Sequence, residues 1–121
     1  MNETSARRWV DAYVRAWSSN DPGDIGALFT DDARYWTAPH REPWAGREGI
    51  VDGWLARKDE PGGWDFRYDV VATADDLAFV RGWTAYADGD RFSNLWVIRL
   101  VDDGRASEFT EWWMDETTPE T

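Results

Sequence analysis

The chain has 121 residues, with 24 acidic and 13 basic side chains and a formal net charge of −11. Such a charge argues against nucleic acid and anionic membranes as partners, because both require a basic surface. The chain has no cysteine for a disulfide or a thiolate metal site, and no apolar run approaches the roughly 18 residues of a membrane helix. The first residues carry no signal-peptide pattern, so we expect a soluble, cytoplasmic protein.

Ten of the 121 residues are tryptophan, several times the usual frequency. Tryptophan combines a large apolar area with an N–H group that needs a partner, which favours it in cores, interfaces and ligand pockets. Ten indoles are more than a core of this size hides. We therefore expect some of them to line a cavity or a subunit contact.

The first predicted element is an amphipathic helix. Apolar side chains recur at helical spacing at Trp9, Tyr13, Ala16 and Trp17, and Thr4 can cap the helix. The breaker cluster SSNDPGD ends it. The charged residues between these positions fall on the other side of the helix, as an amphipathic helix requires.

Two helices and one strand follow. The pattern predicts a short helix over residues 24–29, a strand over 33–37, the loop APHREPWAG and a third helix over 46–58. The phrase EPGGW ends the third helix.

The second half of the chain predicts only strands. WDFRYDVV alternates apolar and charged residues, and LAFVRGWTAY, RFSNLWVIRLV and RASEFTEWWMD follow, separated by turns. Helices followed by an antiparallel meander indicate an α+β domain with helices on one face of a sheet. We expect a single domain over residues 1–121, with an ordered core at about 4–115 and a frayed tail over 116–121.

The last strands are apolar on both faces. Leu95 and Val97 alternate with Trp96 and Ile98, whereas a sheet covered on one side only would alternate apolar and polar residues. The chain has no residues left to cover the second face. We therefore expect a homodimer formed through the sheet.

The order of these elements resembles that of the nuclear transport factor 2-like superfamily, and within it the SnoaL-like polyketide cyclases and the ketosteroid isomerases. The sequence segments that carry the resemblance are YVRAW, ALF and DDARY in the first third, GREGI at the third helix and NLWVIRLVDDGRASEFTEWW at the end. The resemblance implies a cone-shaped, curved antiparallel sheet wrapped around the N-terminal helices and a pocket. The superfamily contains isomerases, cyclases, dehydratases, epoxide hydrolases and non-catalytic members, so the fold leaves the activity open.

The resemblance to the ketosteroid isomerases allows a comparison at three functional positions. Tyr13 falls at their oxyanion tyrosine, and Asn94 falls near their second oxyanion donor. Thr37 falls where their general-base aspartate stands, and threonine cannot act as that base at neutral pH. The resemblance therefore implies a similar pocket with altered chemistry.

The last strand holds two carboxylates, Glu108 and Glu111, on opposite faces. A two-residue turn at 103–104 places Glu111 opposite Trp96, whereas a three-residue turn shifts the register by one and turns the other face inward. The sequence allows both. The resemblance places Glu111 in the pocket, and we choose it as the inward carboxylate.

Burial among aromatic rings raises the pKa of a carboxyl group, so Glu111 is the predicted general base or proton donor. Alternatively, it binds an indole N–H and only orders the pocket. Tyr13 and Asn94 are the predicted donors to an oxyanion, and His40 is a candidate acid–base partner unless it is simply a surface residue. Arg81 either binds an anion in the cavity or pairs with an acid outside it. The expected substrate-binding residues are Trp17, Trp36, Trp54, Arg81, Trp83, Trp96, Phe109 and Trp113.

The functional hypothesis is an enzyme without cofactor that performs general acid–base chemistry on an apolar polyketide-, terpenoid- or steroid-like molecule. Isomerisation, cyclisation, dehydration and epoxide opening all fit. One histidine, no cysteine and no carboxylates at ligand spacing predict no metal site. The alternatives are a non-catalytic small-molecule binding protein of the same fold and an interaction module whose tryptophans serve the subunit contact.

Overall fold

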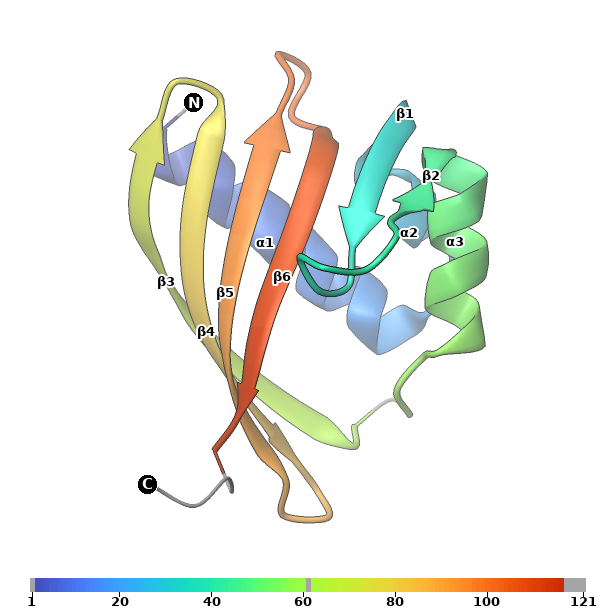
Figure 1. The fold of residues 1–121 in the computed structure, drawn as a ribbon, viewed down its shortest axis with the longest axis vertical. Coiled ribbons are helices and arrows are strands. Elements are labelled where there is room, and N and C mark those ends of the chain that lie inside the picture. The colour runs from blue at the N-terminus through green and yellow to red at the C-terminus, as the bar shows by residue number, and fades with distance from the viewer. Residues whose placement is uncertain (1, 61, 117–121) are drawn as a thin grey trace.

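The computed structural model describes residues 2–60 and 62–116. Its elements are α1 (Glu3–Ser19), α2 (Pro22–Gly26), β1 (Phe29–Trp36), β2 (Trp44–Ala45), α3 (Gly46–Ala56), β3 (Trp64–Ala74), β4 (Leu77–Tyr86), β5 (Arg91–Leu100) and β6 (Ala106–Asp115). The strands form one curved sheet, and α1 runs diagonally across one of its faces (Figure 1). Within the described residues, no helix is long and apolar enough to cross a membrane.

The strand order in the sheet is β2-β1-β6-β5-β4-β3. Neighbouring strands are antiparallel except β1 and β6, which run parallel. The predicted α+β domain with a curved sheet and N-terminal helices is confirmed. The sheet is mixed rather than antiparallel throughout, because the long connection from β1 through β2, α3, β3, β4 and β5 brings β6 beside β1 in the same direction.

The ends of the helices differ from the predicted ones. Asn2, not Thr4, caps α1, because its side chain accepts a hydrogen bond from the Ser5 N–H at 2.8 Å. Asp21 caps the start of α2, which begins at Pro22, earlier than predicted. The helix ends at Gly26, and the residues predicted to complete it lead into β1 instead. Helix α3 ends at Ala56, two residues before the predicted end.

The turn between β5 and β6 is the three-residue alternative. The Val101 N–H donates to the Arg105 carbonyl at 2.9 Å, and Gly104 adopts a positive φ of 90°. The predicted two-residue turn is therefore wrong. A glycine suits this position because a side chain at positive φ would be strained.

A β-bulge restores the predicted register. Ser107 is an extra residue in β6 between the paired positions Ala106 and Glu108. From there on Glu111 lies opposite Trp96, as predicted. The turn and the bulge each shift the pairing by one residue, in opposite directions, so the predicted pairing is confirmed although the predicted turn is not.

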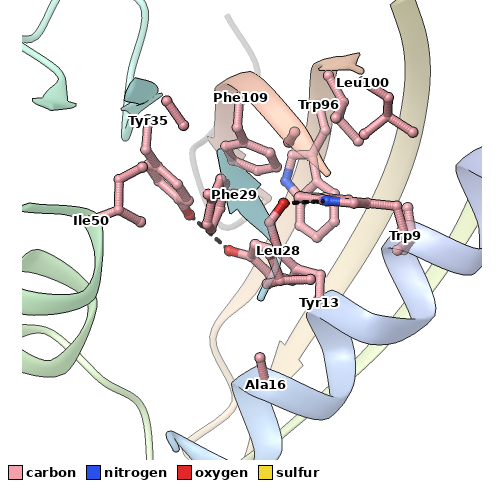
Figure 2. Close-up of a cluster of buried hydrophobic side chains, with 14 of the residues drawn as sticks. Trp9, Tyr13, Ala16, Leu28, Phe29, Tyr35, Ile50, Trp96, Leu100 and Phe109 are labelled. Carbon is pink, nitrogen blue, oxygen red and sulfur yellow. Dashed lines mark hydrogen bonds between the residues drawn. The ribbon is translucent and has the colours of Figure 1, made fainter. Parts of the chain in front are cut away.

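The core lies between α1 and the inner face of the sheet (Figure 2). Trp9 is buried there, and its indole N–H donates to the Leu28 carbonyl at 3.0 Å. Phe109 of β6 is fully buried and stacks on Tyr13 and Tyr35, with ring centres 5.5 and 4.5 Å apart. This aromatic layer forms the base on which the pocket rests.

The outer face of the sheet carries large apolar side chains in contact with solvent. Leu95, Trp112 and Met114 are 39%, 43% and 69% exposed. They lie on neighbouring positions of β5 and β6, where residues alternate with inward-facing ones. The predicted frayed tail falls mostly on residues 117–121, which lie outside the described residues. Glu116, the first residue of that tail, donates its N–H to the Arg91 carbonyl at 2.9 Å.

Candidate active site

A pocket of about 360 Å³ opens between α1, α3 and the inner face of the sheet. Four predicted aromatic residues line it, from three parts of the fold: Trp17, Trp54, Trp96 and Trp113. Tyr13, Asn94 and Glu111, the predicted catalytic residues other than His40, line it as well. Its volume lies near the lower end of the range for small-molecule sites.

Glu111 faces the pocket because its neighbours in β6 point to the outer face. Its Oε2 accepts two hydrogen bonds, from Asn94 Nδ2 at 2.8 Å and from Trp96 Nε1 at 2.9 Å. None of the described residues donates a hydrogen bond to Oε1. One carboxylate oxygen is thus fixed and the other is left for a ligand.

Thr84 sets the orientation of the Asn94 amide. Its hydroxyl donates to Asn94 Oδ1 at 2.8 Å, so the amide nitrogen must face Glu111. The three side chains come from neighbouring positions on β4, β5 and β6 and point to the same face. Asn94 was predicted as an oxyanion donor, and in the structure its amide holds the carboxylate in place.

Burial is the main cause that raises the pKa of Glu111 above the usual value for glutamate. The hydrogen bonds from Trp96 and Asn94 act in the opposite direction, and the negative charge of Asp59 adds to the rise. The carboxylate in its ionised form is therefore a stronger base than an exposed glutamate.

Two tyrosines form a second polar group in the pocket. The hydroxyl oxygens of Tyr13 and Tyr35 lie 2.7 Å apart, and Figure 2 shows them pointing toward each other. Burial is the largest cause that raises the pKa of both, and the charge of Glu111 raises both further. Both phenols remain protonated near neutral pH. One donates to the other, which leaves one O–H group free to donate to a ligand.

Asp59 is a second carboxylate in the pocket. Its Oδ2 accepts hydrogen bonds from Trp17 Nε1 at 2.9 Å and from the Tyr86 hydroxyl at 3.2 Å. The Asn20 amide fixes its backbone by donating to the Asp59 carbonyl at 3.0 Å. Asp59 was not predicted to lie in the pocket, because it falls between the predicted end of the third helix at residue 58 and the segment EPGGW that follows.

Three predicted ligand-binding residues lie outside the pocket. Trp36, Arg81 and Trp83 point to the outer face of the sheet, because their neighbours in β1 and β4 point inward. The Arg81 guanidinium lies 5.4 Å from the centre of the Trp83 ring, and Arg81 Nη2 lies 3.9 Å from a carboxylate oxygen of Asp69. Of the two alternatives for Arg81, pairing with an acid outside the cavity is the one observed.

Two further predictions need correction. Phe109 faces inward as predicted, but it is fully buried beneath the tyrosine pair and does not line the pocket. His40 is exposed in the loop between β1 and β2, and its neighbour Arg41 lines the pocket instead. The loop was correctly placed at the pocket mouth, but alternation cannot predict which side chain of an irregular segment points inward.

Several lining residues were not predicted. Tyr35 and Trp44 stack with ring centres 4.8 Å apart, and Tyr86 and Phe92 lie on β4 and β5. Thr37, noted only as the replacement for a base, also lines the pocket. The described part of the chain contains no group of three or more His, Cys, Asp or Glu side chains placed to hold a metal ion.

The SnoaL-like domain family model matches residues 10–109. Among solved structures, the chain is similar to an NTF-2 like protein of unknown function from Burkholderia xenovorans LB400. The identity is 18% over 99% of this chain and 91% of that chain, with a TM-score of 0.76. The resemblance to the nuclear transport factor 2-like superfamily is thereby confirmed.

Several similar structures have names that state an activity, and two of them illustrate the range. One is a steroid delta-isomerase from Pseudomonas aeruginosa, with 19% identity over 95% of this chain and 83% of that chain and a TM-score of 0.66. The other is an LEH-like epoxide hydrolase from M. tuberculosis, with 19% identity over 93% of this chain and 84% of that chain and a TM-score of 0.62. At these identities the likeness shows the fold alone. No protein of curated function matches the chain significantly.

Proposed function

The chain belongs to the SnoaL-like domain family, and from this premise we propose that it is an enzyme that moves a proton on a small apolar molecule. Glu111 is the general base. The observation that carries the proposal is the asymmetry of its carboxylate in an aromatic pocket, because two N–H groups hold Oε2 and no described residue donates to Oε1. A base must reach the proton it removes, and only Oε1 has that freedom.

The proposed step begins with a ligand carbonyl near the tyrosine pair. Glu111 Oε1 takes a proton from the carbon beside that carbonyl, the electron pair of the C–H bond forms a carbon–carbon double bond, and the π electrons of the carbonyl move onto its oxygen. The free O–H of the pair formed by Tyr13 and Tyr35 donates to the resulting oxyanion. Glu111 then returns the proton to the same carbon or to another one.

The walls of the pocket support an apolar substrate. Trp17, Trp54 and Trp96 line it, and large aromatic side chains suit a polyketide-, terpenoid- or steroid-like skeleton. Proton return to a different carbon gives isomerisation. Cyclisation, dehydration and epoxide opening require the same base and the same donor to oxygen.

The test is hydrogen exchange into cyclic ketones, with 1-tetralone as the first probe. The protein is incubated with each ketone in D2O, and deuterium beside the carbonyl is followed by NMR. Glu111→Gln keeps the shape of the side chain and should lower the enzyme-dependent rate by about 10²- to 10⁴-fold. The matched control is Glu108→Gln, because Glu108 pairs with Arg99 on the outer face of the same strand. Exchange that survives Glu111→Gln within about threefold contradicts the role of Glu111.

A non-catalytic binding protein is the second candidate. The raised pKa of Glu111 favours it, because a protonated Oε1 is a hydrogen-bond donor that can orient a ligand carbonyl. Tryptophan fluorescence titrations with the same ketones separate the two functions. Saturable binding that Glu111→Gln retains, because the Gln amide also donates, and that Glu111→Ala weakens, with no exchange in any ketone, supports the binding protein.

We also propose that the protein is a homodimer through the outer face of its sheet. The exposed side chains of Leu95, Trp112 and Met114 support this contact, since a second copy would bury them all. Sedimentation equilibrium at micromolar concentration should give twice the mass of the chain. Leu95→Lys should shift the protein to the monomer, and a monomeric wild-type protein removes the proposal.

A further inference from the structure

Three basic side chains gather at the pocket. Arg41 comes from the loop between β1 and β2, whereas Arg57 and Lys58 follow the end of α3. They are three of only 13 basic residues in a chain with 24 acidic ones. In Figure 1 the loop passes beside β6 and β2, and the end of α3 leads toward the start of β3. Two segments distant in sequence thus bring positive charge to one opening.

These three cations have no ion-pair partner among the described residues. Five other arginines form ion pairs: Arg7, Arg47, Arg81, Arg99 and Arg105. By contrast, Arg41, Arg57 and Lys58 form no ion pair or side-chain hydrogen bond with any of the described residues. All three are exposed.

The acids of the pocket do not neutralise them either. Glu111 is held by neutral N–H donors, and Asp59 is held by an indole N–H and a phenol. The charge of Arg57 nevertheless reaches inside, because it lowers the pKa of the Tyr35 hydroxyl and partly offsets the effect of burial. The pocket therefore separates its charges, with acids among the aromatic rings and unpaired cations at the exposed end.

We propose that the ligand of this pocket is an apolar carboxylic acid, whose carboxylate is bound by Arg41, Arg57 and Lys58 while its apolar body lies against the tryptophans. Arginine matches a carboxylate with two parallel N–H donors, which gives orientation as well as affinity. Glu111 and Asp59 would repel an anion placed deeper. The ligand can therefore enter in only one direction, with its uncharged end toward Glu111.

This inference rests on the pocket of the proposed function and names the class of its substrate. A carboxylate at the cationic mouth leaves the carbonyl or other reactive group free to meet the tyrosine pair. It also helps association, since the net charge of −11 repels an anionic ligand that three local cations attract.

The test compares two probes of the same shape, adamantane-1-carboxylate and the neutral adamantane-1-carboxamide, by tryptophan fluorescence titration. The wild-type protein should bind the carboxylate at least tenfold more tightly than the amide at low ionic strength. That preference should shrink at 0.5 M NaCl, since salt screens exposed charges. Equal affinities, or no saturable binding of the carboxylate, overturn the inference.

Substitutions test whether the three basic side chains cause the preference for the carboxylate. The triple variant Arg41→Gln, Arg57→Gln and Lys58→Gln should reduce the preference to less than threefold and leave the affinity for the amide unchanged. The matched control changes Arg8, Arg15 and Arg105 to Gln, because these basic residues lie outside the pocket and give the same change in net charge. An equal loss in both triple variants overturns the local site. If circular dichroism shows that the triple variant is unfolded, the preference for the carboxylate is measured in the single variant Arg41→Gln, where it should also decrease.

The outcomes for the two proposals are separate. Exchange in neutral ketones that depends on Glu111, without any preference for the carboxylate, supports the proposed function and overturns the anion site. A preference for the carboxylate that depends on the three cations, without exchange in any ketone, supports the anion site and removes the enzyme.

Discussion

Two glycines one turn apart in α3 should respond in opposite ways to replacement by alanine. A Cβ atom at Gly49 would meet no atom within 4 Å, whereas a Cβ at Gly53 would lie 2.4 Å from Cε2 of Trp44. In a helix the change from glycine to alanine otherwise stabilises by about 0.5–1 kcal/mol. Gly49→Ala should therefore raise the free energy of unfolding by that amount.

Gly53→Ala should lower it instead. Non-bonded carbon atoms prefer separations of about 3.5–4 Å, so the Trp44 ring must move by roughly 1 Å. Its other side stacks on Tyr35, with ring centres 4.8 Å apart, which limits the movement. Overpacking of this kind costs about 1–3 kcal/mol. Because the gain in helix propensity is common to both variants, the two should differ by the overpacking term alone.

Thermal unfolding followed by circular dichroism measures this difference. At about 4 °C per kcal/mol for a domain of this size, the melting temperatures of the two variants should lie roughly 4–12 °C apart. Repeating both substitutions in a Trp44→Ala background removes the clash, and the difference should vanish there. Equal shifts for Gly49→Ala and Gly53→Ala in the wild-type background refute the placement of Trp44 against α3.

Three further variants test the polar groups of the pocket. Glu111→Gln should become more stable relative to wild type as pH rises from 4.5, the ordinary glutamate pKa, through the raised pKa of Glu111. The reason is that burial makes the folded wild-type protein hold a proton that the unfolded chain releases in this range. A difference in melting temperature that does not change with pH contradicts this. Thr84→Val should lose about 1–2 kcal/mol in urea unfolding, since Asn94 Oδ1 loses its donor, whereas Thr110→Val on the outer face of β6 should change little. Tyr35→Phe should lower kcat for ketone exchange by about tenfold or more with little change in KM, and an unchanged kcat removes Tyr35 from the reaction.

Alternation left two registers open for Glu111, and the resemblance was needed to pair it with Trp96; nor did alternation orient every strand. Trp83 was predicted to face the pocket because it is large and apolar. In the structure its neighbour Gly82 faces inward, where a Cβ would lie 2.5 Å from the Phe66 ring. The inner layer at this position is already filled by a side chain from β3, so β4 offers a small residue inside and a large one outside. Alternation defines two faces of a strand, and only packing with its neighbours determines which face is buried.

Asp59 and Tyr35 were not predicted as pocket residues for another reason. Asp59 contacts Trp17, which lies 42 positions earlier in the chain, and Tyr13 contacts Tyr35 across 22 positions. Periodicity reports which face of an element is buried, but it carries no information about which two elements meet. The helix pattern therefore predicted the inward direction of Tyr13 and Trp17, and it could not predict their partners.

The partners of Glu111 bear on its strength as a base. An arginine beside this carboxylate would have fixed its position equally well, but a positive charge lowers the pKa of a carboxyl group and weakens the base. Asn94 and Trp96 fix Oε2 without carrying charge, so the effect of burial outweighs theirs. The arginines of the pocket instead lie at its exposed end, where they can attract an anion without forming an ion pair with Glu111. One arrangement of charges thus serves both the proposed base and the proposed carboxylate site.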